Sequence, residues 1–213
     1  MSPIDRVYTG GNRIIQHYGS WRKITFAEEY QGAHFDGAGN FIVESSSGHL
    51  VFENATDKVI NLKDAAGNDF IKAHMSSTAG TVDGRIYSGY QILNGSLGED
   101  LIFAGADGSQ LWGNADTASD TLVGGDGSDI FVGGKNEGSD TFQNASAADV
   151  INLNDTNLSD IVSTNTRDGS LVISFNTGNS LTVQSTEALS ANIIFSDGTN
   201  RRFNHATNSW QTA

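Results

Sequence analysis

A short repeat rich in glycine and aspartate, in the middle of the chain, constrains the fold more than any other feature of the sequence. Its clearest unit is GGDGSDIFV at residues 124–132, flanked by GNADTASDTLV at 113–123 and GGKNEGSDTFQ at 133–143. An earlier unit is NGSLGEDLIF at 94–103, and AGADGSQLW at 104–112 is a degenerate one. Each unit pairs a turn with a short apolar strand, and a run of such units predicts a stack of coils.

The spacing of the aspartates predicts how the coils stack. If two nine-residue units make one coil, the loops alternate between two edges and units two apart face each other. Asp100, Asp120 and Asp140 are 20 residues apart, as are Asp129 and Asp149. The ideal spacing is about 18 residues, and small insertions account for the difference. The sequence therefore predicts two aspartate columns, one on each edge.

The residue two positions after each of these aspartates is apolar. Because side chains alternate between the two faces of a strand, this position can point inward in every coil. The residues at this position are Ile102, Leu122, Phe131, Phe142 and Ile151. We therefore predict an all-β fold, a parallel β-roll with a thin core of stacked apolar side chains.

The segments on both sides of the repeats are also predicted to be β structure. Residues 1–93 are expected to form a β-rich segment continuous with the roll, which spans 94–152. Residues 153–213 are expected to form a β cap of hairpins, because turn pairs such as Asp168-Gly169 separate short apolar strands. Solenoids need such caps to avoid open edges. No long helix is predicted.

The repeats resemble those of the haemolysin-type (RTX) calcium-binding family over about fifty residues. The strands at 168–199 look like the β-rich cap that follows many such arrays. The resemblance implies a calcium-binding module of a secreted or surface bacterial protein. It also implies type I secretion of the unfolded chain, a C-terminal secretion signal and folding outside the cell.

Calcium suits the residues of these turns. It takes six to eight oxygen ligands, and carboxylates and backbone carbonyls supply them. We predict sites between Asp100 and Asp120 and between Asp120 and Asp140. On the other edge Asp129 is expected to share a site with Asp149, and weakly with the degenerate turn, where Ser109 or Gln110 replaces an aspartate.

Further ligands are predicted in the same turns. Asp126 is expected to assist on the second edge. Glycines allow a turn to adopt positive φ and aim its carbonyls at one point. The resemblance implies carbonyl ligands at the glycine-rich positions: Gly95, Gly98, Gly124, Gly125, Gly127, Gly133, Gly134 and Gly138.

Composition narrows the possible partners. The formal net charge is −13, and phosphate binding needs clusters of lysine and arginine, so no nucleic-acid partner is expected. The chain has no cysteine, which excludes disulfides and thiolate metal sites. No apolar run reaches the roughly 18 residues that span a membrane. Residues 1–10 lack the pattern of a secretory signal.

Three alternatives remain open. Asp-Gly and Asn-Gly pairs are ordinary turn formers, so the repeats can be plain turns without metal. A second alternative is a carbohydrate-binding or adhesive module with structural calcium, whose partner is a surface glycan or a host ligand. Trp112 and Trp210 can stack on sugars, although Trp112 is predicted to lie in the core. The third alternative, an enzyme, is not favoured, because the histidines lack paired metal spacing and neither G-x-S-x-G nor a P-loop is present. The S-x-x-K match at 20–23 lacks its companion SDN and KTG motifs.

Overall fold

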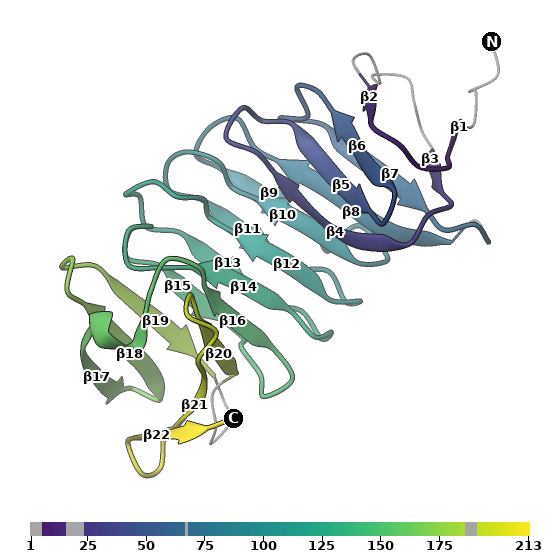
Figure 1. Ribbon diagram of the computed structural model, residues 1–213. Helices are drawn as coiled ribbons and strands as arrows, with labels where there is room; N and C mark the ends of the chain where they lie inside the picture. The colour runs from purple at the N-terminus through teal and green to yellow at the C-terminus, as the bar shows by residue number, and fades with distance from the viewer. Residues whose placement is uncertain (1–5, 16–23, 67, 186–190) are drawn as a thin grey trace.

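The computed structural model describes residues 6–15, 24–66, 68–185 and 191–213. Within these ranges the chain is almost entirely β, and its one short helix is η1 (Leu158–Asp160). Figure 1 shows an elongated parallel β-solenoid of about seven turns, with the purple N-terminal strands at one end and the yellow C-terminal strands at the other. The predicted fold class is confirmed.

Two long sheets form the walls of the solenoid. The larger has eleven strands in the order β1 (Arg6–Tyr8), β3 (Ile24–Phe26), β7 (Val59–Lys63), β8 (Asp69–Met75), β10 (Gln91–Asn94), β12 (Ser109–Trp112), β14 (Ile130–Gly133), β16 (Val150–Leu153), β20 (Asn192–Phe195), β21 (Asn200–Asn204) and β22 (Ser209–Thr212). The second has seven strands in the order β17 (Ile161–Arg167), β18 (Ser170–Phe175), β19 (Ser180–Gln184), β15 (Thr141–Gln143), β13 (Thr121–Val123), β11 (Leu101–Phe103) and β9 (Thr81–Asp83). Within the repeats every pairing between neighbouring coils is parallel, so each coil contributes one strand to each wall.

A third, four-stranded sheet belongs to the N-terminal part. Its order is β2 (Arg13–Ile15), β6 (Gly48–Phe52), β5 (Phe41–Ser45) and β4 (Tyr30–Phe35). Its apolar face, with Phe41 and Phe52, shares one hydrophobic cluster with Ile71 and Ile92 of the eleven-stranded sheet. This sheet therefore covers the outer face of the first coils, and its edge strand β4 lies against β10.

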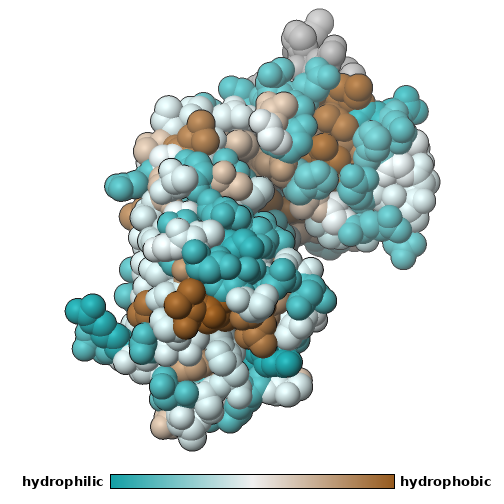
Figure 2. Space-filling model, turned by 60° about the vertical axis from the view of Figure 1, so that its left-hand side comes forward, coloured by the Kyte–Doolittle hydropathy of each residue, from teal (hydrophilic) through white to brown (hydrophobic). Residues whose placement is uncertain are grey.

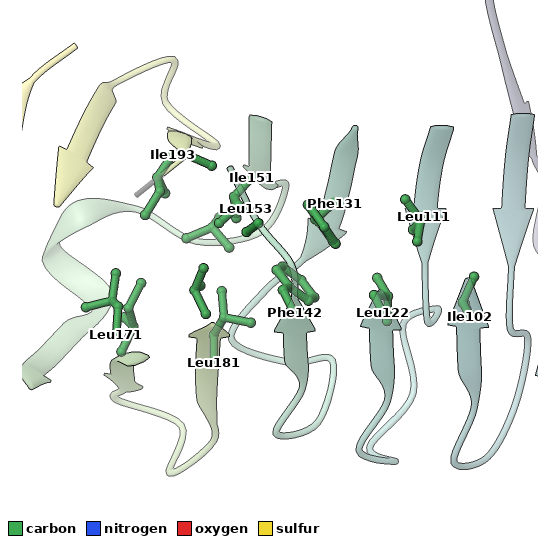
Figure 3. Packing of buried hydrophobic residues seen from close by; sticks show 14 of the residues in the cluster. Ile102, Leu111, Leu122, Phe131, Phe142, Ile151, Leu153, Leu171, Leu181 and Ile193 are labelled. Atoms are coloured by element: carbon green, nitrogen blue, oxygen red, sulfur yellow. The ribbon is translucent and has the colours of Figure 1, made fainter. Parts of the chain in front are cut away.

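The core of the roll is a double row of apolar side chains, one row from each wall. Figure 3 shows Leu111, Phe131 and Ile151 facing Ile102, Leu122 and Phe142, with one residue of each row per coil. All six side chains are fully buried. The Phe131 and Phe142 rings stack with centroids 5.1 Å apart. The five predicted inward positions are confirmed.

The C-terminal cap contains the predicted hairpins. Strands β17, β18 and β19 are antiparallel, and so are β20, β21 and β22. Two of these strands also extend the solenoid walls, because β19 pairs in parallel with β15 and β20 pairs in parallel with β16. The hairpins thus replace one further coil, which seals the last apolar layer.

The core position predicted for Trp112 is wrong. Its neighbour Leu111 is the fully buried, inward residue of β12, so alternation along the strand turns Trp112 to the outer face, where it is half-buried. Trp210 packs edge-on against Phe195 and Phe203, with ring centroids 6.1 and 5.3 Å away. The two tryptophans do not form one exposed aromatic row.

Candidate metal-binding edges

The loops that join the two walls place the aspartates in the two predicted columns. We call the edge with loops 95–100, 113–120 and 134–140 the first edge, and the edge with loops 104–108, 124–129 and 144–149 the second edge. Each column aspartate ends its loop directly before a strand begins. Because the strands pair in register, equivalent aspartates of successive coils lie next to each other.

Backbone hydrogen bonds link the aspartates of the first edge into a ladder. The amide of Asp100 donates to Oδ1 of Asp120 at 2.8 Å, and the amide of Asp120 donates to Oδ1 of Asp140 at 2.9 Å. One coil earlier, the amide of Gly80 donates to Oδ1 of Asp100 at 2.7 Å. Each carboxylate therefore reaches back to the coil before it.

The second edge repeats this arrangement once. The amide of Asp129 donates to Oδ1 of Asp149 at 2.8 Å. Oδ2 of Asp129 accepts the amide of Gly125 at 2.7 Å, and Oδ2 of Asp149 accepts the amide of Ser146 at 2.6 Å. Both oxygens of Asp149 are thus satisfied by backbone amides.

The ladders leave buried carboxylate oxygens without a partner. Oδ2 of Asp100 and Oδ2 of Asp120 are buried and accept no hydrogen bond. Oδ1 of Asp129 also lacks a hydrogen bond of standard geometry, although the amide of Ser109 is close enough to lower the pKa of that carboxyl. A buried polar group without a partner costs about 1–3 kcal/mol, and a charged one costs more. These oxygens need either a proton or a cation.

Burial is the main reason that the pKa values of these carboxyls are raised. It raises the pKa of Asp120 and of Asp140 to about 7, and the pKa of Asp100 and of Asp129 to about 6. The backbone amides of the ladders oppose the rise, and neighbouring carboxylates add to it. Without a cation, the folded edges therefore resist full ionisation at neutral pH.

The glycines serve mainly to let the carboxylates approach the backbone. A Cβ on Gly95 would lie 2.5 Å from Oδ2 of Asp100, and one on Gly124 would lie 3.0 Å from Oδ2 of Asp129. A Cβ on Gly113 would overlap Oδ2 of Asp120. A side chain at these positions would fill the space beside the carboxylate oxygens.

The predicted role of positive φ holds at two of the eight glycines. Gly98 has φ of +93° and Gly138 has φ of +89°. The other six predicted ligand glycines lie outside the left-handed region, so the expectation was wrong for them. These six are Gly95, Gly124, Gly125, Gly127, Gly133 and Gly134. Close approach to another coil or to a carboxylate explains five of them instead: a Cβ on Gly125 would meet the carbonyl of Gly105, and one on Gly134 would meet Asp155. A Cβ on Gly133 would meet the ring of Phe142 in the core.

Acidic residues that the spacing rule missed crowd the first edge. Oδ2 of Asp116 accepts the amide of Gly98 at 2.7 Å, and the charge of Asp116 raises the pKa of Asp100, Asp120 and Asp140. Glu137 is 3% exposed, and burial raises its pKa to about 7. Both lie in the insertions between repeat units, where a fixed period gives no position.

On the second edge the column loses its charge towards the N-terminus. Gln110 pairs with Ile130, so Ser109 holds the column position one coil before Asp129. Gln91 holds the position one coil before that, because it pairs with Ser109. The missing aspartate is therefore Ser109 and not Gln110, which lies on the outer face. Asp126 is exposed, and no described hydrogen bond ties it to the column.

The donor set of the edges fits a hard cation that takes oxygen ligands. Across the described residues, no three aspartate, glutamate or histidine side chains converge as a metal cluster, so carboxylates alone do not complete a site. The turns add backbone carbonyls, which calcium accepts as ligands. The residues that would hold the ion are Asp100, Asp120, Asp140 and Asp129, whose free or ionisable oxygens lie beside glycine-lined turns.

Comparisons with known proteins assign no family to this chain. No protein-family model matches the sequence. No curated protein sequence matches it either. Among the solved structures that match is the crystal structure of the extracellular lipase LipA from Serratia marcescens, at 14% identity and a TM-score of 0.47. That alignment covers 84% of this chain and 32% of the lipase, so the chain spans about a third of that protein. Within the described ranges, no helix is long and apolar enough to cross a membrane.

Proposed function

We propose that this chain is a non-enzymatic calcium-binding module whose roll folds when calcium binds at the aspartate columns. The protein would be secreted or carried on the cell surface, and would fold there after type I secretion, as the family resemblance implies. The observation that supports calcium binding is the buried set of carboxylate oxygens without a hydrogen bond.

The chain would supply a calcium ion with free carboxylate oxygens and with open space beside them. Asp100 and Asp120 each bind the backbone with one oxygen, which fixes the direction of the other oxygen. Bound calcium would supply the positive charge that the edge lacks. The adjacent glycine turns keep the space beside each oxygen free of side chains.

The same geometry favours calcium over magnesium. Magnesium requires near-ideal octahedral geometry and usually keeps several waters. The carboxylate of Asp120 is 1% exposed and its donors belong to the backbone of a curved turn, which leaves little room for a hydration shell. Calcium tolerates irregular sets of six to eight oxygens.

Calcium binding would be coupled to folding because the columns exist only when coils stack. The unfolded chain separates Asp100 from Asp120 by 20 residues, so the binding free energy becomes folding free energy. Calcium-binding modules outside cells have dissociation constants of about 10⁻⁴–10⁻³ M. A module of this affinity would fold in calcium-rich surroundings outside the cell.

A calcium titration of the EDTA-treated chain tests the proposal. Far-UV circular dichroism should gain β signal cooperatively as calcium is added, and magnesium at the same concentrations should give a much smaller change. Isothermal titration calorimetry supplies the stoichiometry. A spectrum that is native-like in EDTA and indifferent to calcium would demote the repeats to plain turns.

A further inference from the structure

A groove on the outer face of the eleven-stranded sheet is lined by none of the column aspartates. It lies where the four-stranded sheet ends, between the edge strand β4 and the outer faces of β10, β12, β14 and β16. Its volume is about 170 Å³. In Figure 2 the N-terminal part, at the top, overhangs the rest of the molecule, and brown hydrophobic surface lies in the hollow beside it.

The floor of the groove is one row of side chains that crosses four strands. Asn94 pairs with Trp112, Trp112 with Val132, and Val132 with Asn152. Neighbouring strands are about 4.8 Å apart, so the row is about 14 Å long. A tryptophan and an aliphatic side chain thus lie between two amides.

A buried glutamate fixes the position of the tryptophan in this row. Nε1 of Trp112 donates a hydrogen bond to Oε2 of Glu137 at 2.9 Å, and Glu137 is almost fully buried. The bond satisfies the indole N–H and leaves the half-buried ring surface facing the groove. A fixed aromatic ring is an apolar platform for the C–H face of a flat ligand ring.

Two amide side chains beside the tryptophan have no hydrogen-bond partner within the described part of the chain. They are Gln110, on the same strand, and Asn152, at the end of the row, and both are half-buried. An amide offers two donors and an acceptor, which suits a hydroxyl that both donates and accepts. An apolar platform flanked by free amides is a suitable arrangement for a sugar ring.

The charge of the groove sets the class of sugar. The described residues that line it include no aspartate, glutamate, lysine or arginine, although the chain carries a net charge of −13. The volume is below the roughly 300–1,000 Å³ of pockets that enclose a drug-sized ligand, so the groove fits about one ring of a longer chain. We propose that this groove binds a neutral polysaccharide, with one ring over Trp112 and its hydroxyls at Gln110 and Asn152.

A peptide is the competing occupant, because β4 is an edge strand. A peptide paired with β4 would bond to the backbone of that strand and leave the amides of Gln110 and Asn152 without partners. The free side-chain groups of the floor therefore favour a glycan. The proposal does not depend on calcium binding at the edges.

Calorimetry on the calcium-saturated chain of 213 residues tests this site. The probes are neutral hexasaccharides of glucose, mannose, xylose and N-acetylglucosamine, with a hexauronate as the charged probe. At least one neutral probe should bind with a dissociation constant below about 1 mM. Gln110→Ala should weaken that binding at least about tenfold, because it removes hydrogen bonds to the sugar.

The matched control is Gln143→Ala, which removes a half-buried glutamine from the outer face of the other wall and should leave binding unchanged. Circular dichroism of both variants confirms that they are folded. The proposal is overturned if no neutral probe binds, if the hexauronate binds as tightly as the best neutral probe, or if both variants weaken binding equally. It is also overturned if the groove captures displayed peptides in a Gln110-dependent way and no sugar.

Discussion

Replacing Asp120 with asparagine should have opposite effects on stability with and without calcium. In the wild type the amide of Asp100 donates to Oδ1 of Asp120 at 2.8 Å. Asparagine keeps an oxygen that can accept this hydrogen bond, but it carries no negative charge. Alanine would remove both the bond and the charge, so it would not separate the two roles. The variant Asp120→Asn therefore isolates the charge of the most central carboxylate of the first edge.

Without calcium, the variant should be more stable than the wild type at about pH 7.5. Burial raises the pKa of Asp120 from 3.8 to about 7, which is a shift of roughly three units. At 1.36 kcal/mol per unit, the carboxylate opposes folding by up to about 4 kcal/mol. Local relaxation lowers this cost, and we expect Asp120→Asn to gain about 2 kcal/mol.

With calcium, the same variant should be less stable than the wild type. A site filled at about 100 times its dissociation constant adds about 2.7 kcal/mol to folding. Asp120 lies between the coils of Asp100 and Asp140, so its charge serves the sites on both sides. The two sites together add about 5 kcal/mol, and losing them outweighs the gain of about 2 kcal/mol that the variant shows without calcium. We therefore expect Asp120→Asn to be about 3 kcal/mol less stable than the wild type in calcium, and to need more calcium for folding.

Urea unfolding of both chains, in EDTA and in calcium at about 100 times the dissociation constant that calorimetry gives, measures the two effects. For chains that are unfolded in EDTA, trimethylamine-N-oxide restores the compact state and its midpoint replaces that of urea. The control is Asp168→Asn, an exposed turn position with φ of +50° that asparagine tolerates. A loss of equal size with and without calcium would refute the reasoning, because it would make Asp120 a structural hydrogen-bond acceptor and nothing more.

Three further predictions follow from the same edges and core. In EDTA, stability should fall as pH rises from about 4 to about 7. The folded-state pKa values of about 6–7 exceed the unfolded value of 3.8, so the folded chain binds more protons than the unfolded chain in that window. A melting temperature that rose across this pH range would contradict the prediction. Phe142→Ala should lower the free energy of unfolding by about 3–5 kcal/mol in calcium, measured with urea, because the ring is fully buried and stacks on Phe131. Phe103→Ala, on the outer face, should lower it much less, and equal losses would show that the stacked row is not the core. Ser109→Asp should extend the second column by one coil and raise the calcium stoichiometry in calorimetry by about one ion, whereas an unchanged stoichiometry would mean that a column aspartate is not sufficient for a site.

The parts of the fold that repeat could be predicted from the sequence. A 20-residue spacing fixed which aspartates meet, and the strand period of two fixed which apolar residues point inward. The error at Trp112 came from the degenerate unit, where alternation has to be counted from Ser109. Counted in that way, Leu111 is the inward residue, as in every other unit.

The parts that the sequence did not predict depend on non-periodic contacts. Glu137 and Asp116 lie in insertions, so no repeat position assigned them to the first edge. The four-stranded sheet has the ordinary alternation of a half-buried sheet, and nothing local specifies which wall it covers. The groove exists only because that sheet stops at β10, so it could not be inferred before the packing was known.

The hydrogen-bond ladders give the assembly of the roll a direction. Four of the five column carboxylates accept an amide from the coil that precedes them, as Asp120 does for Asp100 and Asp149 does for Asp129. A coil is therefore completed by a residue that comes 20 positions later in the chain. When coils form in order from the N-terminus, each newly formed coil must wait for its successor before its loop amide is satisfied. The order of closure is then set by chain polarity, and the last coils depend on the hairpin cap, which ends the series with side chains and turns of its own.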